Sequence, residues 1–178
     1  RDYMGEKLWN RLMTLLVVLQ TDLVLEHSIP LTGHFIDYRG STLNWCPIGR
    51  NAEKQDRDKW KEMDSNYKIR KSFLKQLKTL VHTQCTHLGD LRASDVELTV
   101  KYGGDTSFDI FPLGWDKTCV LDMFDIFFDY EQIYFIGDRC EQDGNDYEIF
   151  EHPKTIGFKT NSPDETIKIV NKIIYSNV

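Results

Sequence analysis

The sequence predicts an α/β protein of two parts, an α+β part over residues 1–112 and a part with alternating strands and helices over residues 113–178. Two stretches of alternating apolar and polar residues turn at Gly40 and at Gly103, which predicts two antiparallel hairpins in the first part. The nearly all-apolar run Ile133–Ile136 is typical of a strand covered on both faces, which indicates part of a parallel sheet in the second part.

Composition limits the classes of protein to which the chain can belong. It has 178 residues, of which 40% are hydrophobic, and no apolar run as long as the roughly 20 residues that span a bilayer. Asp and Glu outnumber Lys and Arg by 28 to 22, so no nonspecific nucleic-acid surface is expected and any cationic site must be local. The four cysteines form no C-x-x-C pair, which favours reduced thiols. We expect a soluble cytoplasmic protein without nucleic-acid or membrane partners.

The spacing of apolar residues predicts three helices in the first part. Leucines recur at helical spacing over residues 4–24, and the apolar residues of 69–83 share one face. A further helix is expected to begin near Ala52 and to end near residue 67. The two hairpins are expected within residues 34–48 and 96–111.

The second part is expected to alternate between helices and strands. A helix is predicted over residues 115–128 and a short one over 144–150. Strands are predicted over 132–138 and 155–160, and a last helix over 162–174 begins at a Ser-Pro cap.

Three arginines are candidates for the local cationic site. Arg39, Arg50 and Arg57 lie in or just after the first hairpin. One guanidinium group can donate hydrogen bonds to two phosphate oxygens at once. Several guanidinium groups together neutralise a dianion that an acidic protein would otherwise repel. Unrelated surface arginines would have the same spacing, so the residues alone leave both interpretations open.

Oxygen-bearing side chains form two more candidate groups. Ser107 and Asp109 share one face of a strand, where they can bind sugar hydroxyls, although solvent-facing strand residues have the same pattern. Asp138 follows an apolar strand, and Asn145 and Asp146 lie in the next turn. Oxygen ligands at the carboxyl end of a parallel strand suit Mg²⁺. A solvated turn is the alternative, and the spacing excludes an EF-hand.

The cysteines and histidines carry weaker signals. His82, Cys85 and His87 imitate a zinc site, but three ligands without a fourth at the end of an amphipathic helix are typical of surface residues. Cys46 and Cys119 are expected to be buried small apolar groups.

Three motifs in this order, FIDYRGSTLNWCPIGR, SFDIFPLGWDK and GDRCEQDGNDYEIF, resemble the eukaryotic phosphomannomutases, members of the haloacid-dehalogenase superfamily with a mobile cap domain. The resemblance covers nearly the whole chain. It implies that residues 1–112 are the substrate-binding cap and that residues 113–178 are the carboxyl-terminal part of a haloacid-dehalogenase-like Rossmannoid core.

The resemblance also implies an activity. Enzymes of this family are isomerases that interconvert mannose 6-phosphate and mannose 1-phosphate through a hexose bisphosphate and an aspartyl phosphate, for GDP-mannose supply. Mg²⁺ as cofactor, a cytoplasmic location and a homodimer formed through the cap are expected on the same ground.

In the cap, the resemblance implies a role for each candidate residue. Arg39, Arg50 and Arg57 match the arginines that hold the distal phosphate of the substrate. Ser107 and Asp109 match the ligands of the sugar hydroxyls.

In the core, the resemblance implies a metal site and a supporting lysine. Asp138 matches the Mg²⁺ carboxylate, and Asn145 and Asp146 support its loop. Lys117 matches the lysine that steadies the aspartyl phosphate.

Two departures from the family matter. A second metal in the family uses the carbonyl at Phe150, an acid at the position of His152, and Thr155, and the histidine places that site in doubt. The family's D-x-D-G-T segment, which carries the nucleophile, is not found in this sequence, which begins at Arg1. We therefore expect that the amino-terminal core is missing and that the chain alone is inactive.

Two alternatives remain open at this point. The chain can be a non-catalytic sugar-phosphate-binding or dimerisation fragment, or it can belong to a sugar-phosphate phosphatase of the same superfamily. Binding of mannose 1-phosphate tests the first alternative, and product analysis tests the second.

Overall fold

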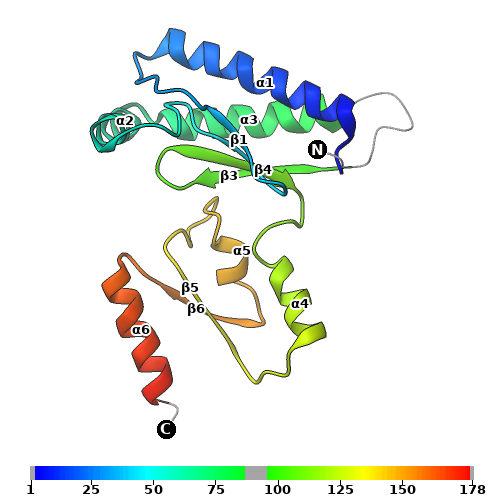
Figure 1. Cartoon of the computed structure of the whole chain (residues 1–178), viewed down its shortest axis with the longest axis vertical. Coiled ribbons are helices and arrows are strands. Elements are labelled where there is room, and N and C mark those ends of the chain that lie inside the picture. The colour runs from blue at the N-terminus through cyan, green and yellow to red at the C-terminus, as the bar shows by residue number, and fades with distance from the viewer. Residues whose placement is uncertain (1–2, 87–95, 177–178) are drawn as a thin grey trace. The chain divides into compact units, whose positions relative to one another are not determined.

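The computed structural model describes residues 3–86 and 96–176, which form two compact units, Arg1–Leu113 and Gly114–Val178 (Figure 1). The first unit has an antiparallel sheet with helices, and the second has a parallel pair of strands with helices. The predicted α/β class is thus confirmed.

The first unit joins the two predicted hairpins into one sheet. Its strands pair antiparallel in the order β1-β2-β4-β3, so the hairpins meet along β2 and β4. The elements of this unit are α1 (Gly5–Glu26), β1 (Ile36–Tyr38), β2 (Leu43–Trp45), α2 (Lys54–Tyr67), α3 (Ile69–Thr86), β3 (Leu98–Gly103) and β4 (Ser107–Pro112).

Helices α1 and α3 cover one face of this sheet (Figure 1). Trp45 of β2 stacks on Phe108 of β4 with ring centroids 5.2 Å apart, and it also contacts Phe73 of α3. Both Trp45 and Phe108 are fully buried. The core of the first unit therefore lies between the sheet and these two helices.

Helix α1 contributes much of this core on one side, while Val17, Val18 and Leu25 are exposed. By length and composition it could cross a membrane, a possibility that the shorter apolar run in the sequence did not indicate. Its buried residues are six leucines that pack in the core of the first unit: Leu8, Leu12, Leu15, Leu16, Leu19 and Leu23.

The other face of the sheet carries a row of polar residues, one from each strand. Asp37 lies opposite Asn44, Asn44 opposite Asp109, and Asp109 opposite Lys101. Directly opposite residues of antiparallel strands share a face, so these four side chains form a line across the sheet. We call Asp37, Asn44, Asp109 and Lys101 the polar row.

The second unit contains the parallel pair β5 (Ile133–Gly137) and β6 (Thr155–Lys159). Its helices are α4 (Cys119–Phe127), α5 (Tyr147–Phe150) and α6 (Pro163–Ser176). Residues Ile133–Ile136 are only half-buried, because within the described residues β5 has β6 as its one strand neighbour. The parallel pairing expected from this run is confirmed, but the run is not covered on both faces in this chain.

Two predictions about α4 were also wrong. The helix begins at Cys119 rather than at Trp115, because the Asp116 side chain accepts hydrogen bonds from the N–H and hydroxyl of Thr118 and holds a turn there. Cys119 is exposed, since the buried residue of α4 is Leu121, on a different side of the helix. Cys46, in contrast, is buried as expected.

A carboxylate ties α4 to the segment before β6. Asp125 accepts hydrogen bonds from the Tyr130 hydroxyl and the Lys154 ammonium group. The hydrogen bond from Lys154 is the main cause that lowers the pKa of Asp125 below its ordinary value of 3.8. A lowered pKa means that the folded state favours the ionised carboxylate, so the stabilisation is present above the ordinary pKa and is lost as pH falls through the folded one.

We therefore expect Asp125→Asn to be less stable than the parent near about pH 6, and the difference to vanish toward about pH 2. The effect is small because these side chains are exposed to water. Denaturant midpoints across this pH range measure it, with the exposed neighbour Asp129→Asn as control. A difference between Asp125→Asn and the parent that persists at the lowest pH would contradict this account.

Candidate functional site

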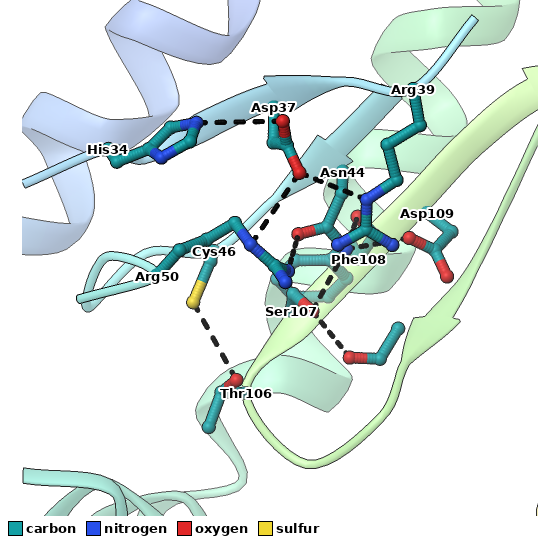
Figure 2. A network of polar contacts seen from close by, with 11 residues as sticks. His34, Asp37, Arg39, Asn44, Cys46, Arg50, Thr106, Ser107, Phe108 and Asp109 are labelled. Carbon is teal, nitrogen blue, oxygen red and sulfur yellow. Dashed lines mark hydrogen bonds and ion pairs between the residues drawn. The ribbon is translucent and has the colours of Figure 1, made fainter. Parts of the chain in front are cut away.

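Arg39 and Arg50 meet at one carboxylate of the polar row, Asp37 (Figure 2). The Nε atoms of Arg39 and Arg50 lie 3.0 Å and 3.5 Å from the same Asp37 oxygen, Oδ2. His34 Nε2 lies 3.5 Å from the other oxygen. Because each arginine uses its Nε on Asp37, terminal N–H groups of both guanidinium groups remain for a ligand. We call Arg39 and Arg50 the arginine pair.

Asp37 is the counter-ion of the arginine pair. The hydrogen bond from Arg39, together with the charges of Arg39, Arg50 and His34, lowers the pKa of Asp37 below its ordinary value. The carboxylate is therefore ionised at neutral pH and offsets one of the two positive charges. One net positive charge remains for an anionic ligand.

The turn that follows β2 places Arg50 beside the sheet. Pro47 occupies the second position of a turn closed by a hydrogen bond from Gly49 N–H to Cys46 O. Gly49 has a φ of 90°, in the left-handed region that favours glycine. The Arg50 N–H then donates to His34 O, which ties the start of the arginine side chain to the segment before β1.

Asn44 links the arginine pair to the predicted hydroxyl ligands (Figure 2). Its Oδ1 accepts a hydrogen bond from Arg50 Nη1 at 3.1 Å. Its Nδ2 donates to Ser107 Oγ at 3.0 Å and to Asp109 Oδ1 at 2.6 Å. The structure thus brings four of the five predicted residues, Arg39, Arg50, Ser107 and Asp109, into one network.

No role was assigned to Asp37 or Asn44 from the sequence, although both lie within the motif FIDYRGSTLNWCPIGR. Each is a single polar residue between two apolar ones, in Ile-Asp-Tyr and Leu-Asn-Trp. On a short strand this pattern indicates a polar side chain on the face away from the core. That signal could have found both residues.

Ser107 and Asp109 are not solvent-facing strand residues. Ser107 is buried and Asp109 is half-buried. The Ser107 hydroxyl donates to Gly103 O, so its oxygen and the Asp109 carboxylate can only accept hydrogen bonds from a ligand. A site with guanidinium donors at one end and acceptor oxygens at the other fits an anion that carries hydroxyl groups.

Arg57 is not joined to this network by any hydrogen bond or ion pair in the described part of the chain. It lies in the first turns of α2, is exposed, and donates from Nε to Ala52 O at 2.9 Å. Its role in phosphate binding stays a prediction.

In the second unit, Asp146 organises the turn after β5. Its carboxylate is almost fully buried and accepts hydrogen bonds from the N–H groups of Asp138 and Arg139 through Oδ2. Its Oδ1 forms an ion pair with Lys117 Nζ. Asp146 therefore holds both the turn and the lysine, which leaves Asp138 as the exposed carboxylate at the strand end.

A depression of about 660 Å³ lies at the carboxyl ends of β5 and β6, beside the start of α6. Its polar walls are formed by residues that include Lys117, Asp138, Asp146, Thr160 and Ser162. In α/β proteins, ligands bind outside the carboxyl ends of the strands.

The Asp138 carboxylate fits Mg²⁺ as one ligand, whereas Asn145 is not among the residues that line this depression. The Asp138 carboxylate is exposed, and the buried Oδ1 of Asn145 has no hydrogen-bond partner in the structure. Mg²⁺ keeps several water ligands and is often bound through one or two protein carboxylates together with substrate phosphate. Among the described residues, no three His, Cys, Asp or Glu side chains come together as a metal site.

The proposed second metal site fits a hard cation poorly. The Thr155 hydroxyl donates to the carbonyls of Ile149 and His152, and His152 Nδ1 accepts the N–H of Lys154. Internal hydrogen bonds therefore already hold the loop between Phe150 and Thr155. A neutral imidazole is a weak substitute for a carboxylate toward an oxygen-preferring ion.

The zinc alternative cannot be assigned to a described site. His82 lies on α3, while His87 and the side chain of Cys85 are outside the described residues.

Comparison with known proteins gives a consistent match. A protein-family model described as eukaryotic phosphomannomutase matches residues 1–176. The phosphomannomutase of Drosophila melanogaster is 37% identical over 150 residues, which cover 84% of this chain and 54% of that protein. The Arabidopsis thaliana phosphomannomutase is 39% identical, with 81% of this chain and 53% of that protein covered. For Saccharomyces cerevisiae phosphomannomutase the identity is 34%, over 97% of this chain and 61% of that protein.

The matches cover only part of each relative, and a solved structure has a similar fold. The chain spans between about half and three-fifths of the length of these curated relatives. Among solved structures, the N-terminal truncated, IMP-bound IMP-nucleotidase of Plasmodium falciparum has a TM-score of 0.56 at 11% identity, covering 97% of this chain and 39% of that one. At this identity the likeness concerns the fold alone.

Proposed function

The chain belongs to the eukaryotic phosphomannomutase family, and we propose that its first unit binds the sugar phosphate in the interconversion of mannose 6-phosphate and mannose 1-phosphate. The observation that carries this proposal is the continuous network from the arginine pair through Asn44 to Ser107 and Asp109. The chain spans only part of the length of its relatives. The mutase activity is therefore proposed for a protein that contains this sequence, and sugar-phosphate binding is proposed for the chain itself.

The first unit would hold the end of the substrate that is not reacting. Terminal N–H groups of Arg39 and Arg50, with Arg57 from α2, would bind the phosphate oxygens. Ser107 and Asp109 would accept hydrogen bonds from sugar hydroxyls. A hexose bisphosphate must present each phosphate in turn, so this unit would bind phosphate and hydroxyls in either orientation of the sugar.

The second unit would serve the reacting phosphate. Phosphoryl transfer needs positioning and neutralisation of charge, which bound Mg²⁺ supplies. Asp138 would contribute an oxygen to that ion, Asn145 and Asp146 would support its loop, and Asp146 would hold Lys117 near the transferred group. The proposal assigns no nucleophile to this chain, whose sequence has no D-x-D-G-T segment.

Cellular and assembly properties are proposed on family likeness alone. They are a cytoplasmic location, a contribution to GDP-mannose supply, and a homodimer formed through the first unit.

Binding tests the proposal without requiring turnover. We expect the chain to bind mannose 1-phosphate in calorimetric titration, and Arg50→Ala to weaken binding about tenfold or more, because a charge-assisted hydrogen bond contributes about 1.5–3 kcal/mol. Arg11→Ala removes the same charge from an exposed position on α1 and serves as the control. Equal losses in the two variants would mean that Arg50 makes no specific phosphate contact, and no binding by the parent chain would contradict the proposal.

A further inference from the structure

Asn44 is a buried polar residue at the centre of the network. It is 1% exposed and stands between the buried Leu43 and Trp45 on a strand that pairs with two others. Burying an amide is unfavourable unless its hydrogen bonds are made, so this position requires partners for both ends of the side chain. Arg50 satisfies one end, and Ser107 and Asp109 satisfy the other.

The chemistry of these partners fixes the orientation of the Asn44 amide. A guanidinium group can only donate, so Arg50 must face the amide oxygen. An ionised carboxylate can only accept, so Asp109 must face the amide nitrogen. If the amide were rotated by half a turn, its NH₂ group would face the Arg50 guanidinium, which is also a donor, and its oxygen would face the Asp109 carboxylate, which is also an acceptor. The amide therefore links a donor group to an acceptor group in one direction only.

The same bonds leave Asn44 little capacity for a ligand. Both hydrogens of its Nδ2 are used, one on Ser107 Oγ and one on Asp109 Oδ1, and Phe108 O is a more distant third acceptor at 3.5 Å. Its oxygen accepts from Arg50, and the side chain is out of contact with solvent. Any effect of Asn44 on a bound sugar phosphate must therefore act through its three neighbours.

We propose that Asn44 is a positioning residue that sets the spacing between the phosphate-binding arginine pair and the hydroxyl-binding residues Ser107 and Asp109. This proposal rests on the proposed function of the site. The two halves come from different places in the chain, since Arg50 follows β2 whereas Ser107 and Asp109 lie on β4. Asn44 is hydrogen-bonded to both halves. A ligand that carries both a phosphate and hydroxyl groups gains from fixed spacing, whereas a ligand that carries phosphate alone does not.

The binding test compares two probes on the full chain. In Asn44→Leu, which removes the polar atoms at similar size, we expect affinity for mannose 1-phosphate to fall about tenfold or more. Affinity for inorganic phosphate is expected to change less than about twofold, because Asp37 still holds the arginine pair. Asn10→Leu, the same change at an exposed position on α1, should leave both affinities unchanged. Equal losses for the two probes in Asn44→Leu would overturn the proposal.

A second measurement does not depend on ligand binding. The NMR signals of the Arg50 Nη–H groups, one of which faces Asn44 Oδ1, are expected to broaden and exchange faster in Asn44→Leu, while the Nε–H signal of Arg39, which has no bond to Asn44, keeps its width. If Asn44→Leu does not fold, Asn44→Ala provides the same readout, because it also removes the bond to Arg50 Nη1. An Arg50 signal unchanged in the folded variant would overturn the positioning role. Failure of the parent chain to bind mannose 1-phosphate would contradict the proposed function, while the Arg50 signal would still decide the role of Asn44.

Discussion

Gly49→Ala is expected to destabilise the first unit by about 3 kcal/mol or more and to disrupt phosphate binding. A Cβ atom at this position would lie 2.2 Å from Gly33 O and 2.6 Å from Thr32 Oγ1, closer than such atoms approach. The obstacle is mainly backbone, so no side-chain rotation relieves it. The φ of 90° adds the strain of a conformation that side chains rarely adopt.

The clash falls on the contacts that position Arg50. Ile48 O accepts hydrogen bonds from the N–H and the hydroxyl of Thr32, and Arg50 N–H donates to His34 O. Moving Gly49 away from Gly33 would stretch these bonds and shift the arginine. Loss of stability and loss of binding should therefore appear together.

Gly40→Ala is the matched control for the stability effect. Gly40 also has a positive φ, of 83°, but a Cβ there would have no atom within 4 Å. Gly40→Ala should lower the free energy of unfolding by about 1 kcal/mol, because it adds the backbone strain of the positive φ but no steric clash. Guanidinium denaturation followed by tryptophan fluorescence reports mainly on the first unit, which contains Trp9, Trp45 and Trp60. Equal midpoints for the two variants would show that the loop yields without cost.

Local patterns in the sequence were enough to predict the elements of the first unit and their faces. The leucines of α1 and the alternation in Leu-Asn-Trp and Phe-Asp-Ile indicate which side chains enter the core. Which hairpin strands pair with each other is decided by contacts far apart in the chain, such as Asn44 opposite Asp109. The sequence therefore indicated that single residues of the polar row face away from the core, but not that they lie next to one another across the sheet.

The candidate sites show the same limit. Spacing alone could not separate Arg39 and Arg50, which meet at Asp37, from Arg57, which bonds to Ala52. The ion pair of Lys117 with Asp146 joins residues on either side of α4 and β5, and no local pattern predicts it. Such contacts depend on how the elements pack, and here family resemblance supplied expectations that composition and periodicity could not.

Arg70→Ala is the second change for which a large effect is expected, a loss of about 3 kcal/mol in the stability of the first unit. Arg70, in the first turn of α3, donates from Nε to Asp64 Oδ2 at 2.8 Å and from Nη1 to Gly104 O at 2.8 Å. Its guanidinium also lies over the Tyr102 ring, 5.1 Å from the centroid. Both Arg70 and Asp64 are mostly buried, so removing one partner leaves the other charge without compensation.

The Arg70 network ties the corner between α2 and α3 to the turn between β3 and β4. Gly103, the last residue of β3 before this turn, provides the carbonyl that accepts the Ser107 hydroxyl, so loosening the turn should also weaken hydroxyl binding. Lys61→Ala is the control, because Lys61 pairs with Asp105 of that turn at 2.7 Å but both side chains are exposed. Such an exposed pair contributes at most about 1 kcal/mol.

Arg70→Lys separates charge from geometry. Lysine keeps the positive charge but cannot reach Asp64 and Gly104 O together as a planar fork does, so we expect an intermediate loss of stability. Denaturation followed by tryptophan fluorescence measures all three variants. If Arg70→Ala were no less stable than Lys61→Ala, burial of the Arg70–Asp64 pair would not matter, and the β3–β4 turn would be held by its backbone alone.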